Sequence, residues 1–291
     1  PHSERQYRES MMSAFVEKRF ATRDGLSLYY RDFAGPEGKT PVLCLSGTTG
    51  NSKQYLELAT RLSADRRVLC MDWRGHGQSD YDPDWEHYSY FVDRDDVLDL
   101  LSHEGLDRVV IIGTSLGGIV TMHIVLERPD AIAGVVMNDV GPVIGAGGRQ
   151  RLHDNMGKPM VFDSIEEAAA AQKERAESGI TLTDAEWLER TKRIYKSRDG
   201  KVVPDMDPVY GKVFRARKRP PDWWDSWEAM KDKPVLIVRG AVSDILDEEV
   251  LAEMAERKPD MRKAIVPGRG HCPSLSEPEA VSAIDTFLAE T

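Results

Sequence analysis

Cysteine is scarce in this sequence. The 291 residues include three cysteines, an odd number, at Cys44, Cys70 and Cys272. The first two lie inside apolar runs with the pattern of buried strands, so the sequence does not indicate a disulfide framework. Because disulfides persist mainly in oxidising environments, a reducing compartment fits this chain better.

Positive charge is also in short supply. The chain carries 49 Asp and Glu against 39 Lys and Arg, which gives a formal net charge of -10 and a pI near 5.3. A surface with this excess of acid repels polyphosphate and anionic lipid. Nucleic acids and membranes are therefore not expected as partners.

A long apolar run is missing as well. The longest stretch without Asp, Glu, Lys or Arg, residues 109–126, contains three glycines and several hydroxyl side chains, which is too polar for a lone membrane span. The segment 1–10 mixes acids and bases and lacks the apolar core of a secretory signal, so cytoplasmic residence is the expected location. Histidine spacings typical of metal sites do not occur, and neither a metal nor a cofactor is expected.

What the sequence does contain is a regular alternation of short apolar runs and helical patterns. This alternation is typical of βαβ units, and it predicts an α/β fold with a largely parallel sheet. An opening hairpin is expected at 15–22 and 26–34, followed by strands at 41–45, 67–73, 108–112, 132–138, 234–239 and 263–266. The expected helices between them are 51–62, 89–101, 116–127, 247–257 and 278–288.

The alternation is interrupted once, between about residues 141 and 230. That region has no convincing buried strand, only helical patterns such as 164–177 and 184–196. We therefore predict one core built from residues 1–142 and 231–291, with residues 143–230 as a helical insertion. Near its end a basic run, 215–219, is interpreted as a solvated face, and Trp223, Trp224 and Trp227 either line an apolar pocket or pack the insertion onto the core.

The most informative motif is Gly113-Thr114-Ser115-Leu116-Gly117, a G-x-S-x-G pattern. It directly follows an expected strand and directly opens an expected helix, which is the context of a nucleophile elbow. The turn places the serine in a strained backbone conformation, and the flanking positions must lack bulky side chains. Ser115 is therefore the predicted nucleophile, and the helix N-terminus beneath it offers N–H groups to a developing oxyanion.

A serine nucleophile needs a base, and the base needs a carboxylate that orients it. His271 follows a Pro-Gly-Arg-Gly loop late in the chain and is the predicted base; His76, in an Arg-Gly-His-Gly loop, is a weaker alternative. Asp244 lies just beyond a late strand, 27 residues before His271, and is the predicted acid. Asp139 also follows a strand end and remains the alternative acid.

At this point the chain resembles the α/β-hydrolase superfamily over nearly its whole length. The order Ser115, Asp244, His271 is the chain order of that superfamily's catalytic triad. The resemblance implies a mostly parallel eight-stranded sheet flanked by helices, with the insertion as a cap after the sixth strand. The segments that carry it are 46–50 (SGTTG), 72–79 (DWRGHGQS), 113–118 (GTSLGG), 240–244 (GAVSD) and 270–271 (GH).

The resemblance also implies an oxyanion hole. In the superfamily, the loop after the third strand usually reads His-Gly-x, and the backbone N–H of x joins that of the residue after the nucleophile. Here these donors would be Thr48 and Leu116, with Ser46 standing where the histidine usually stands. Because the donors are backbone groups, this departure need not remove the hole. Some superfamily members place the triad acid at the strand end that Asp139 follows.

The chemistry implied is acyl transfer through a covalent acyl-enzyme. Dehalogenases and epoxide hydrolases of this fold use an aspartate nucleophile, so a serine points away from them. We expect cleavage of a small-molecule ester or lactone by a monomer or homodimer. The alternatives are a carbon-carbon bond hydrolase of ring-cleavage products, an acyltransferase or perhydrolase, and a ligand receptor that has kept the pocket without turnover. The carbon-carbon hydrolases usually carry a tryptophan after the catalytic histidine, where this chain has Cys272.

Overall fold

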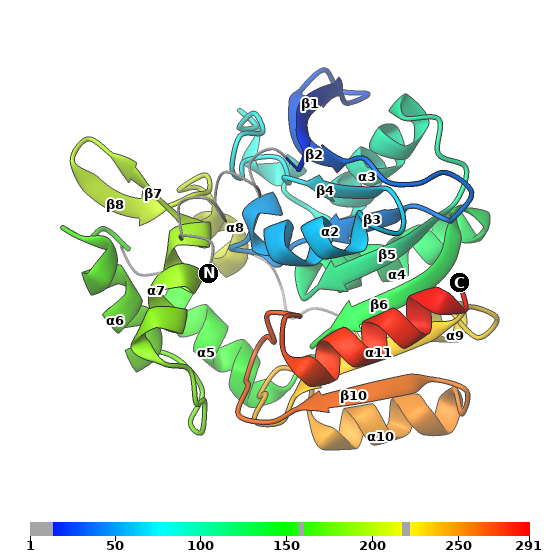
Figure 1. Cartoon of the computed structure of the whole chain (residues 1–291). Helices are drawn as coiled ribbons and strands as arrows, with labels where there is room; N and C mark the ends of the chain where they lie inside the picture. Colours follow the sequence, from blue (N-terminus) through cyan, green and yellow to red (C-terminus); the bar gives the residue numbers. More distant parts are fainter. Residues whose placement is uncertain (1–13, 157–159, 217–221) are drawn as a thin grey trace, which may run out of the picture.

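The centre of the molecule is a twisted sheet of eight strands in the order β1-β2-β4-β3-β5-β6-β9-β10 (Figure 1). The computed structural model describes residues 14–156, 160–216 and 222–291. The strands are β1 (Val16–Ala21), β2 (Ser27–Phe33), β3 (Val42–Leu45), β4 (Val68–Met71), β5 (Val109–Thr114), β6 (Ile132–Asn138), β9 (Val235–Gly240) and β10 (Arg262–Val266). Within this sheet, only the pairs β1·β2 and β2·β4 are antiparallel, which confirms the expected hairpin and the largely parallel sheet.

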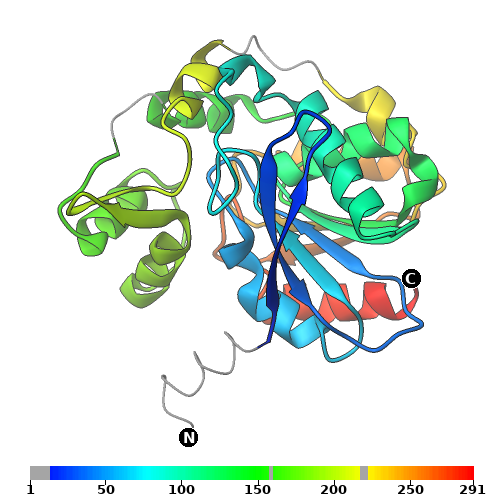
Figure 2. The ribbon, with the colours of Figure 1, turned by 90° about the horizontal axis from the view of Figure 1, so that it is seen from above.

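Helices cover both faces of this sheet (Figures 1 and 2). The core helices are α2 (Leu56–Leu62), α3 (Tyr90–His103), α4 (Leu116–Glu127), α10 (Glu248–Arg257) and α11 (Pro278–Ala289), with short 3-10 turns η1 (Ser52–Tyr55), η2 (Trp85–His87) and η3 (Pro129–Ala131). Successive strand residues point to opposite faces. In β3, for example, Leu43 and Leu45 pack on the face covered by α3 and α4, while Val42 and Cys44 pack against α2 and α11. Burial on both faces explains why the central strands are continuous apolar runs.

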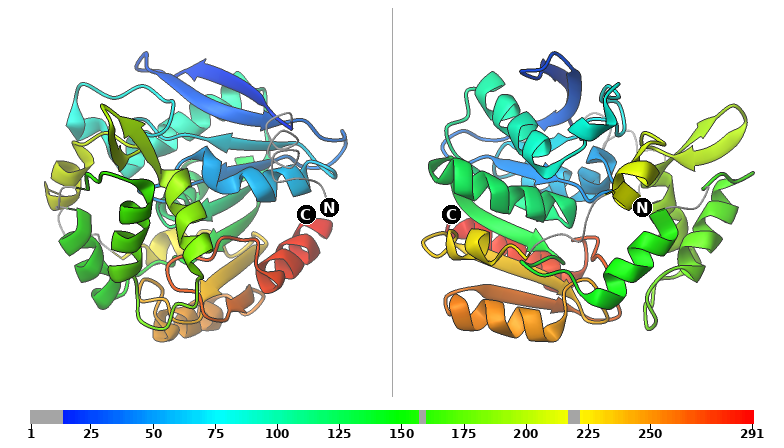
Figure 3. Two further views of the ribbon diagram at one scale, coloured as in Figure 1. Left: turned by 60° about the vertical axis from the view of Figure 1, so that its left-hand side comes forward. Right: turned by 180° about the vertical axis from the view of Figure 1, so that it is seen from behind.

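The chain between β6 and β9 forms a separate layer beside the carboxyl ends of the parallel strands (Figures 1 and 3). Its elements are α5 (Ala146–Met156), α6 (Ile165–Glu174), α7 (Asp184–Ile194), β7 (Tyr195–Arg198), β8 (Lys201–Pro204) and α8 (Tyr210–Ala216). The last helix before β9, α9 (Trp224–Glu228), lies outside this layer and packs against α4 of the core. α6 packs on α7, and α5 packs on α8. Residues 217–219 of the basic run lie outside the described residues.

The antiparallel hairpin β7·β8 is a feature of this layer that the sequence did not predict. Its two-residue turn, Asp199 and Gly200, has φ values of 52° and 73°, and positive φ at both positions is what a tight hairpin turn of the I′ class requires. The strands are short and mostly exposed, with only Tyr195 and Val203 buried, so they lack the apolar run that marks a buried strand. The expectation of a purely helical insertion was wrong for this reason.

The tryptophans near the end of the insertion pack onto the core. Trp223 and Trp227 are buried in the same apolar cluster as α4, and the Trp223 N–H donates to the Pro142 carbonyl at 2.8 Å. The chain therefore enters and leaves the insertion at neighbouring points. Trp224 packs against the edge of the same cluster, which supports the packing alternative.

Asp205, which follows β8, anchors this layer to the core. Its side chain is 7% exposed and accepts from Lys53 at 2.8 Å and Asn51 at 3.2 Å, both in the core, while Lys196 of β7 lies 3.0 Å away. Burial works to raise the pKa of the Asp205 carboxyl, but the two ammonium groups outweigh it, and the pKa lies below its ordinary value. The ionised carboxylate therefore stabilises the contact between the two layers.

We expect Asp205→Asn to lower the free energy of unfolding by about 1–3 kcal/mol at pH 7, because the variant loses two charge-assisted hydrogen bonds. The pKa of the Asp205 carboxyl is lower in the folded than in the unfolded protein. Its contribution to the free energy of unfolding is therefore fully present above the unfolded pKa of about 3.9 and is lost as the pH falls through the folded pKa. Urea unfolding of both proteins from pH 7 to pH 3 measures this difference. Asp163→Asn, which removes an exposed ion pair to Lys201, is the matched control and should change stability by under about 0.5 kcal/mol. A deficit of equal size at every pH would contradict the electrostatic explanation.

Candidate active site

Ser115 lies at the sharp turn between β5 and α4, as predicted. Its φ is 49° and its ψ is -109°, a conformation that is strained for a residue with a side chain. A Cβ atom on Gly113 would lie 2.7 Å from the Gly117 carbonyl group, and one on Gly117 would lie 2.1 Å from the Leu45 carbonyl oxygen. The two glycines are therefore required by the close approach of the backbone on either side of the serine.

His271 meets Ser115 from the loop after β10. Its Nε2 lies 3.0 Å from the Ser115 Oγ, and its Nδ1 lies 2.7 Å from an Oδ of Asp139. The Asp139 side chain has no exposed surface, while that of His271 is 11% exposed. A hydroxyl, an imidazole and a buried carboxylate thus form one hydrogen-bonded line, which can move a proton from the hydroxyl to the ring.

The structure corrects the predicted partner of the histidine. The carboxylate at His271 is Asp139, directly after β6, and Asp244 instead binds Arg151 of α5 through two contacts of 2.8 and 2.7 Å. Burial works to raise the pKa of Asp244, but Arg151 outweighs it and the pKa lies below its ordinary value. Both acids follow strands that end at the same sheet edge, and only the direction of each loop decides which one reaches the ring.

Two further groups hold Asp139 in place and were not singled out from the sequence. The Ser243 hydroxyl donates to Asp139 Oδ2 at 2.5 Å, and the Gly240 N–H donates to Oδ1 at 2.9 Å. Both come from the end of β9 and the loop after it, because β9 is the neighbour of β6 in the sheet. The only sequence signal was their position beside Asp244, which the wrong acid assignment obscured.

The loop after β3 lies against the serine. A Cβ on Gly47 would contact the Ser115 Cβ at 3.4 Å, and the Gly117 N–H donates to the Ser46 carbonyl at 3.1 Å. Within the described residues, the N–H groups of Thr48 and Leu116 have no hydrogen-bond partner. The two unpaired N–H groups therefore belong to the residues that follow Gly47 and Ser115, the two positions where the loop meets the serine turn.

His76 supports this loop and does not contact Ser115. Its Nε2 lies 2.7 Å from the Thr48 carbonyl oxygen, and its Nδ1 lies 3.0 Å from that of Arg74. Burial lowers the pKa of His76, although the carbonyl contacts act in the opposite direction. The ring therefore positions the Thr48 peptide, and its alternative assignment as the base lacks a contact to the serine.

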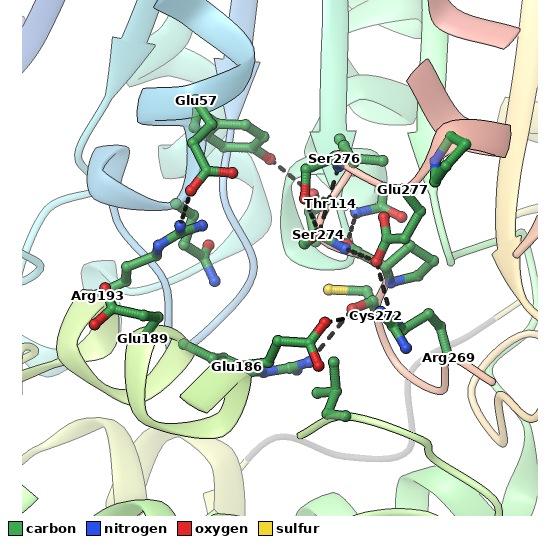
Figure 4. A pocket seen from close by; sticks show the side chains of 18 of the residues that line it. Glu57, Thr114, Glu186, Glu189, Arg193, Arg269, Cys272, Ser274, Ser276 and Glu277 are labelled. Atoms are coloured by element: carbon green, nitrogen blue, oxygen red, sulfur yellow. Dashed lines mark hydrogen bonds and ion pairs between the residues drawn. The ribbon is translucent and has the colours of Figure 1, made fainter. Parts of the chain in front are cut away.

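A cavity of about 180 Å³ lies between the core and the insertion and includes His271 in its wall. Thr49 of the loop after β3 lines it from the core side, and α6 and α7 line it from the other. A larger cavity of about 540 Å³ has Cys272 and the segment after it in its wall (Figure 4). His271 lines the smaller cavity and not the larger one, whereas Ser115 lines neither, so the smaller cavity is taken as the candidate substrate site on the position of His271.

Cys272, next to the histidine, points into the larger cavity in Figure 4. Burial raises the pKa of its thiol to about 12. The group is therefore a neutral thiol at physiological pH and does not compete with Ser115 as a nucleophile.

One group of side chains in the described part of the chain has the spacing of a cation site. It consists of Asp24, Asp82 and His87, away from the serine. The Arg74 guanidinium already contacts both carboxylates, at 2.9 and 2.5 Å, and supplies the positive charge that an ion would bring. Over the same described residues, no helix has the length and apolarity needed to cross a membrane.

Comparison with known proteins places this geometry in a family. A family model described as "Alpha/beta hydrolase family" matches residues 42–284. A crystal structure of an alpha/beta hydrolase from Novosphingobium aromaticivorans superposes with a TM-score of 0.90 and 35% identity, covering 96% of this chain and 99% of that one. The chain is also similar to a 3-hydroxybutyrate-oligomer hydrolase of Cupriavidus necator, with 28% identity over 89% of this chain and 92% of the relative. A 2-(acetamidomethylene)succinate hydrolase of Mesorhizobium japonicum is 26% identical over 87% and 89%.

The family match covers both ends of the sheet's central strands, the serine turn and the histidine loop. The strand order of the sheet and the sharp turn at Ser115 agree with this family, and both are properties of the fold itself. With hydrolases among its relatives over most of its length, this chain belongs to the α/β-hydrolase family.

Proposed function

We propose that this protein is a serine hydrolase that cleaves a carboxylic ester or lactone of a small molecule through a covalent acyl-enzyme. The observation that carries the proposal is the line from Ser115 Oγ to His271 Nε2, 3.0 Å, and from His271 Nδ1 to Asp139, 2.7 Å. In this assignment Ser115 is the nucleophile, His271 the general base and acid, and Asp139 the orienting carboxylate, in place of Asp244.

The proposed reaction has two halves. The Ser115 oxygen attacks the carbonyl carbon as His271 Nε2 takes its proton, and the N–H groups of Thr48 and Leu116 donate to the resulting oxyanion. His271 then protonates the leaving alkoxide, which departs as an alcohol, or stays attached when the substrate is a lactone. Water enters and gives a proton to His271 as its oxygen attacks the acyl carbon; His271 then returns that proton to the Ser115 oxygen as the acid is released. Asp139 stays ionised throughout and stabilises the imidazolium.

The insertion, residues 143–230, is proposed to act as the cap over this site. It supplies most of the wall of the 180 Å³ cavity, and a cavity of that size favours a small substrate. The similarity to a 3-hydroxybutyrate-oligomer hydrolase supports an ester substrate, because such oligomers are joined by ester bonds. Short hydroxy-acid esters are therefore the first compounds to test.

The test combines turnover with covalent labelling. The protein is incubated with p-nitrophenyl esters of short and medium chain length, with lactones and with 3-hydroxybutyrate oligomers, and a fluorophosphonate probe is mapped by peptide mass spectrometry. We expect ester turnover and a single labelled peptide that contains Ser115. A labelled but inert enzyme would favour the carbon-carbon hydrolase alternative, and added alcohols or peroxide would reveal an acyltransferase or perhydrolase by their products. Absence of both labelling and turnover would favour a ligand receptor.

A further inference from the structure

We propose that Arg175 and Arg190 form a carboxylate-binding subsite in the cap wall of the cavity, so that the substrate is an ester bearing a free carboxylate. This inference rests on the proposed function, whose base, His271, lines the same cavity. It adds a recognition element that the triad and the oxyanion donors do not specify.

Arg175 lies directly after α6 and lines the same cavity as His271. The residue is half-buried, yet its guanidinium has no hydrogen bond or ion pair to any of the described residues. Nearby guanidinium groups are engaged: Arg151 binds Asp244 and Glu177, and Arg193 of α7 binds Glu57. A half-buried guanidinium with no protein anion beside it keeps its N–H donors for solvent or a ligand, and a carboxylate in the cavity would bind it through charge-assisted hydrogen bonds.

Arg190 of α7 approaches the same cavity beside the histidine. Its guanidinium donates to the carbonyl oxygens of His271, at 3.1 Å, and Cys272, at 3.4 Å, and lies 5.7 Å from the centre of the Trp187 ring. No carboxylate of the described residues binds it. Because a guanidinium has five N–H donors, these two contacts leave donors available for an anion.

The rest of the wall fits a small organic acid. The cavity has one acidic lining residue, Glu177, whose carboxylate already accepts from Arg151 at 2.9 Å and from the His271 N–H at 2.6 Å. Apolar groups, Met160, Trp187, Ile194 and Tyr195, line the same cavity as the two guanidinium groups. Apolar walls around two guanidinium groups suit a carboxylate on a short carbon chain better than a heavily hydrated polyanion.

A purely structural role for Arg175 makes a different prediction. A cation at the C-terminal end of α6 interacts favourably with the helix dipole, and its loss would weaken the helix. Such a loss would affect acidic and neutral substrates alike. Discrimination between an acidic ester and its neutral counterpart therefore separates the two roles.

The experiment measures kcat/KM for two matched substrate pairs. The first is p-nitrophenyl hydrogen glutarate and its methyl ester, with the carboxylate on the acyl side. The second is the linear 3-hydroxybutyrate dimer and its methyl ester, with the carboxylate on the leaving-group side. The proteins are the wild type, Arg175→Gln, Arg175→Lys and Arg190→Gln. Arg198→Gln, which removes an exposed cap arginine of β7 outside the cavity, is the control.

In at least one pair the wild type should prefer the acidic ester. Arg175→Gln should lower the acidic-to-neutral ratio of kcat/KM by about 10- to 100-fold, the size of a lost charge-assisted hydrogen bond. Arg190→Gln should lower the ratio in the same direction, Arg175→Lys should restore part of it, and Arg198→Gln should leave it unchanged. An unchanged ratio in Arg175→Gln, or no wild-type preference in either pair, overturns the subsite.

Calorimetry separates this inference from the proposed reaction. Monomethyl glutarate is titrated into Ser115→Ala and into the same protein carrying Arg175→Gln. Binding that depends on Arg175 without turnover of any ester would support the subsite and reject the ester hydrolase. Ester turnover without Arg175-dependent binding or discrimination would reject the subsite and leave the hydrolase intact.

Discussion

Replacing Ser115 by alanine is expected to lower kcat for ester hydrolysis by about 10⁴- to 10⁶-fold, the range found when a serine nucleophile is removed from a triad. The physical reason is that no other group can form the acyl bond at this position. Cys272 is a neutral thiol that points away from the cavity holding His271, and alanine keeps the backbone of the turn. The measurement is kcat and KM on the ester that the wild type turns over best.

The matched control for this loss is Ser102→Ala, on the exposed side of α3, which should stay within about twofold of the wild type, as surface substitutions usually do. The Ser115 variant should also lose all fluorophosphonate labelling while its unfolding midpoint stays close to that of the wild type. Substantial residual turnover in pure Ser115→Ala protein would show that another nucleophile performs the reaction.

The second large effect separates the two candidate acids. Asp139→Asn is expected to lower kcat/KM by about 10⁴-fold, because an amide cannot hold the histidine tautomer that accepts the serine proton. Asp244→Asn should cost no more than about tenfold, since its carboxylate binds Arg151 and acts on His271 through its charge without a hydrogen bond. The same ester and the same pH serve for both variants.

Folding must be measured alongside these rates. The Asp139 carboxylate also accepts from Gly240 and Ser243, so the Asn variant is expected to unfold at a lower temperature. Ser243→Ala removes one of these hydrogen bonds and keeps the carboxylate at His271, so its rate and unfolding temperature show how much of the effect comes from losing support for Asp139. If Asp244→Asn abolished turnover and Asp139→Asn did not, Asp244 would be the functional partner of His271.

The tertiary structure decides which of the two acids contacts the histidine. Asp139 and Asp244 each follow a strand that ends at the same sheet edge, and the chain order of the residues permits either assignment. Their roles differ because the Asp139 side chain is buried beneath the ring, whereas Asp244 faces the guanidinium of Arg151 from the insertion. Residues more than ninety positions apart set this choice, so no local pattern contains it.

The sequence alone determined the sheet, the serine turn and the histidine. The constraints behind these predictions act within a few neighbouring residues. They are the apolar runs of the buried strands, the helical periodicity between them and the crowding at Gly113 and Gly117. Only the tertiary structure decided which carboxylate reaches His271 and that Trp223 and Trp227 pack into the core. It also decided that 195–204 folds as a hairpin. The meeting of Arg175 and Arg190 in one cavity, without carboxylate partners among the described residues, is likewise a result of folding. The physical reason is that periodicity and backbone strain are local. Side-chain pairing and charge neutralisation instead depend on segments that meet only once the chain has folded.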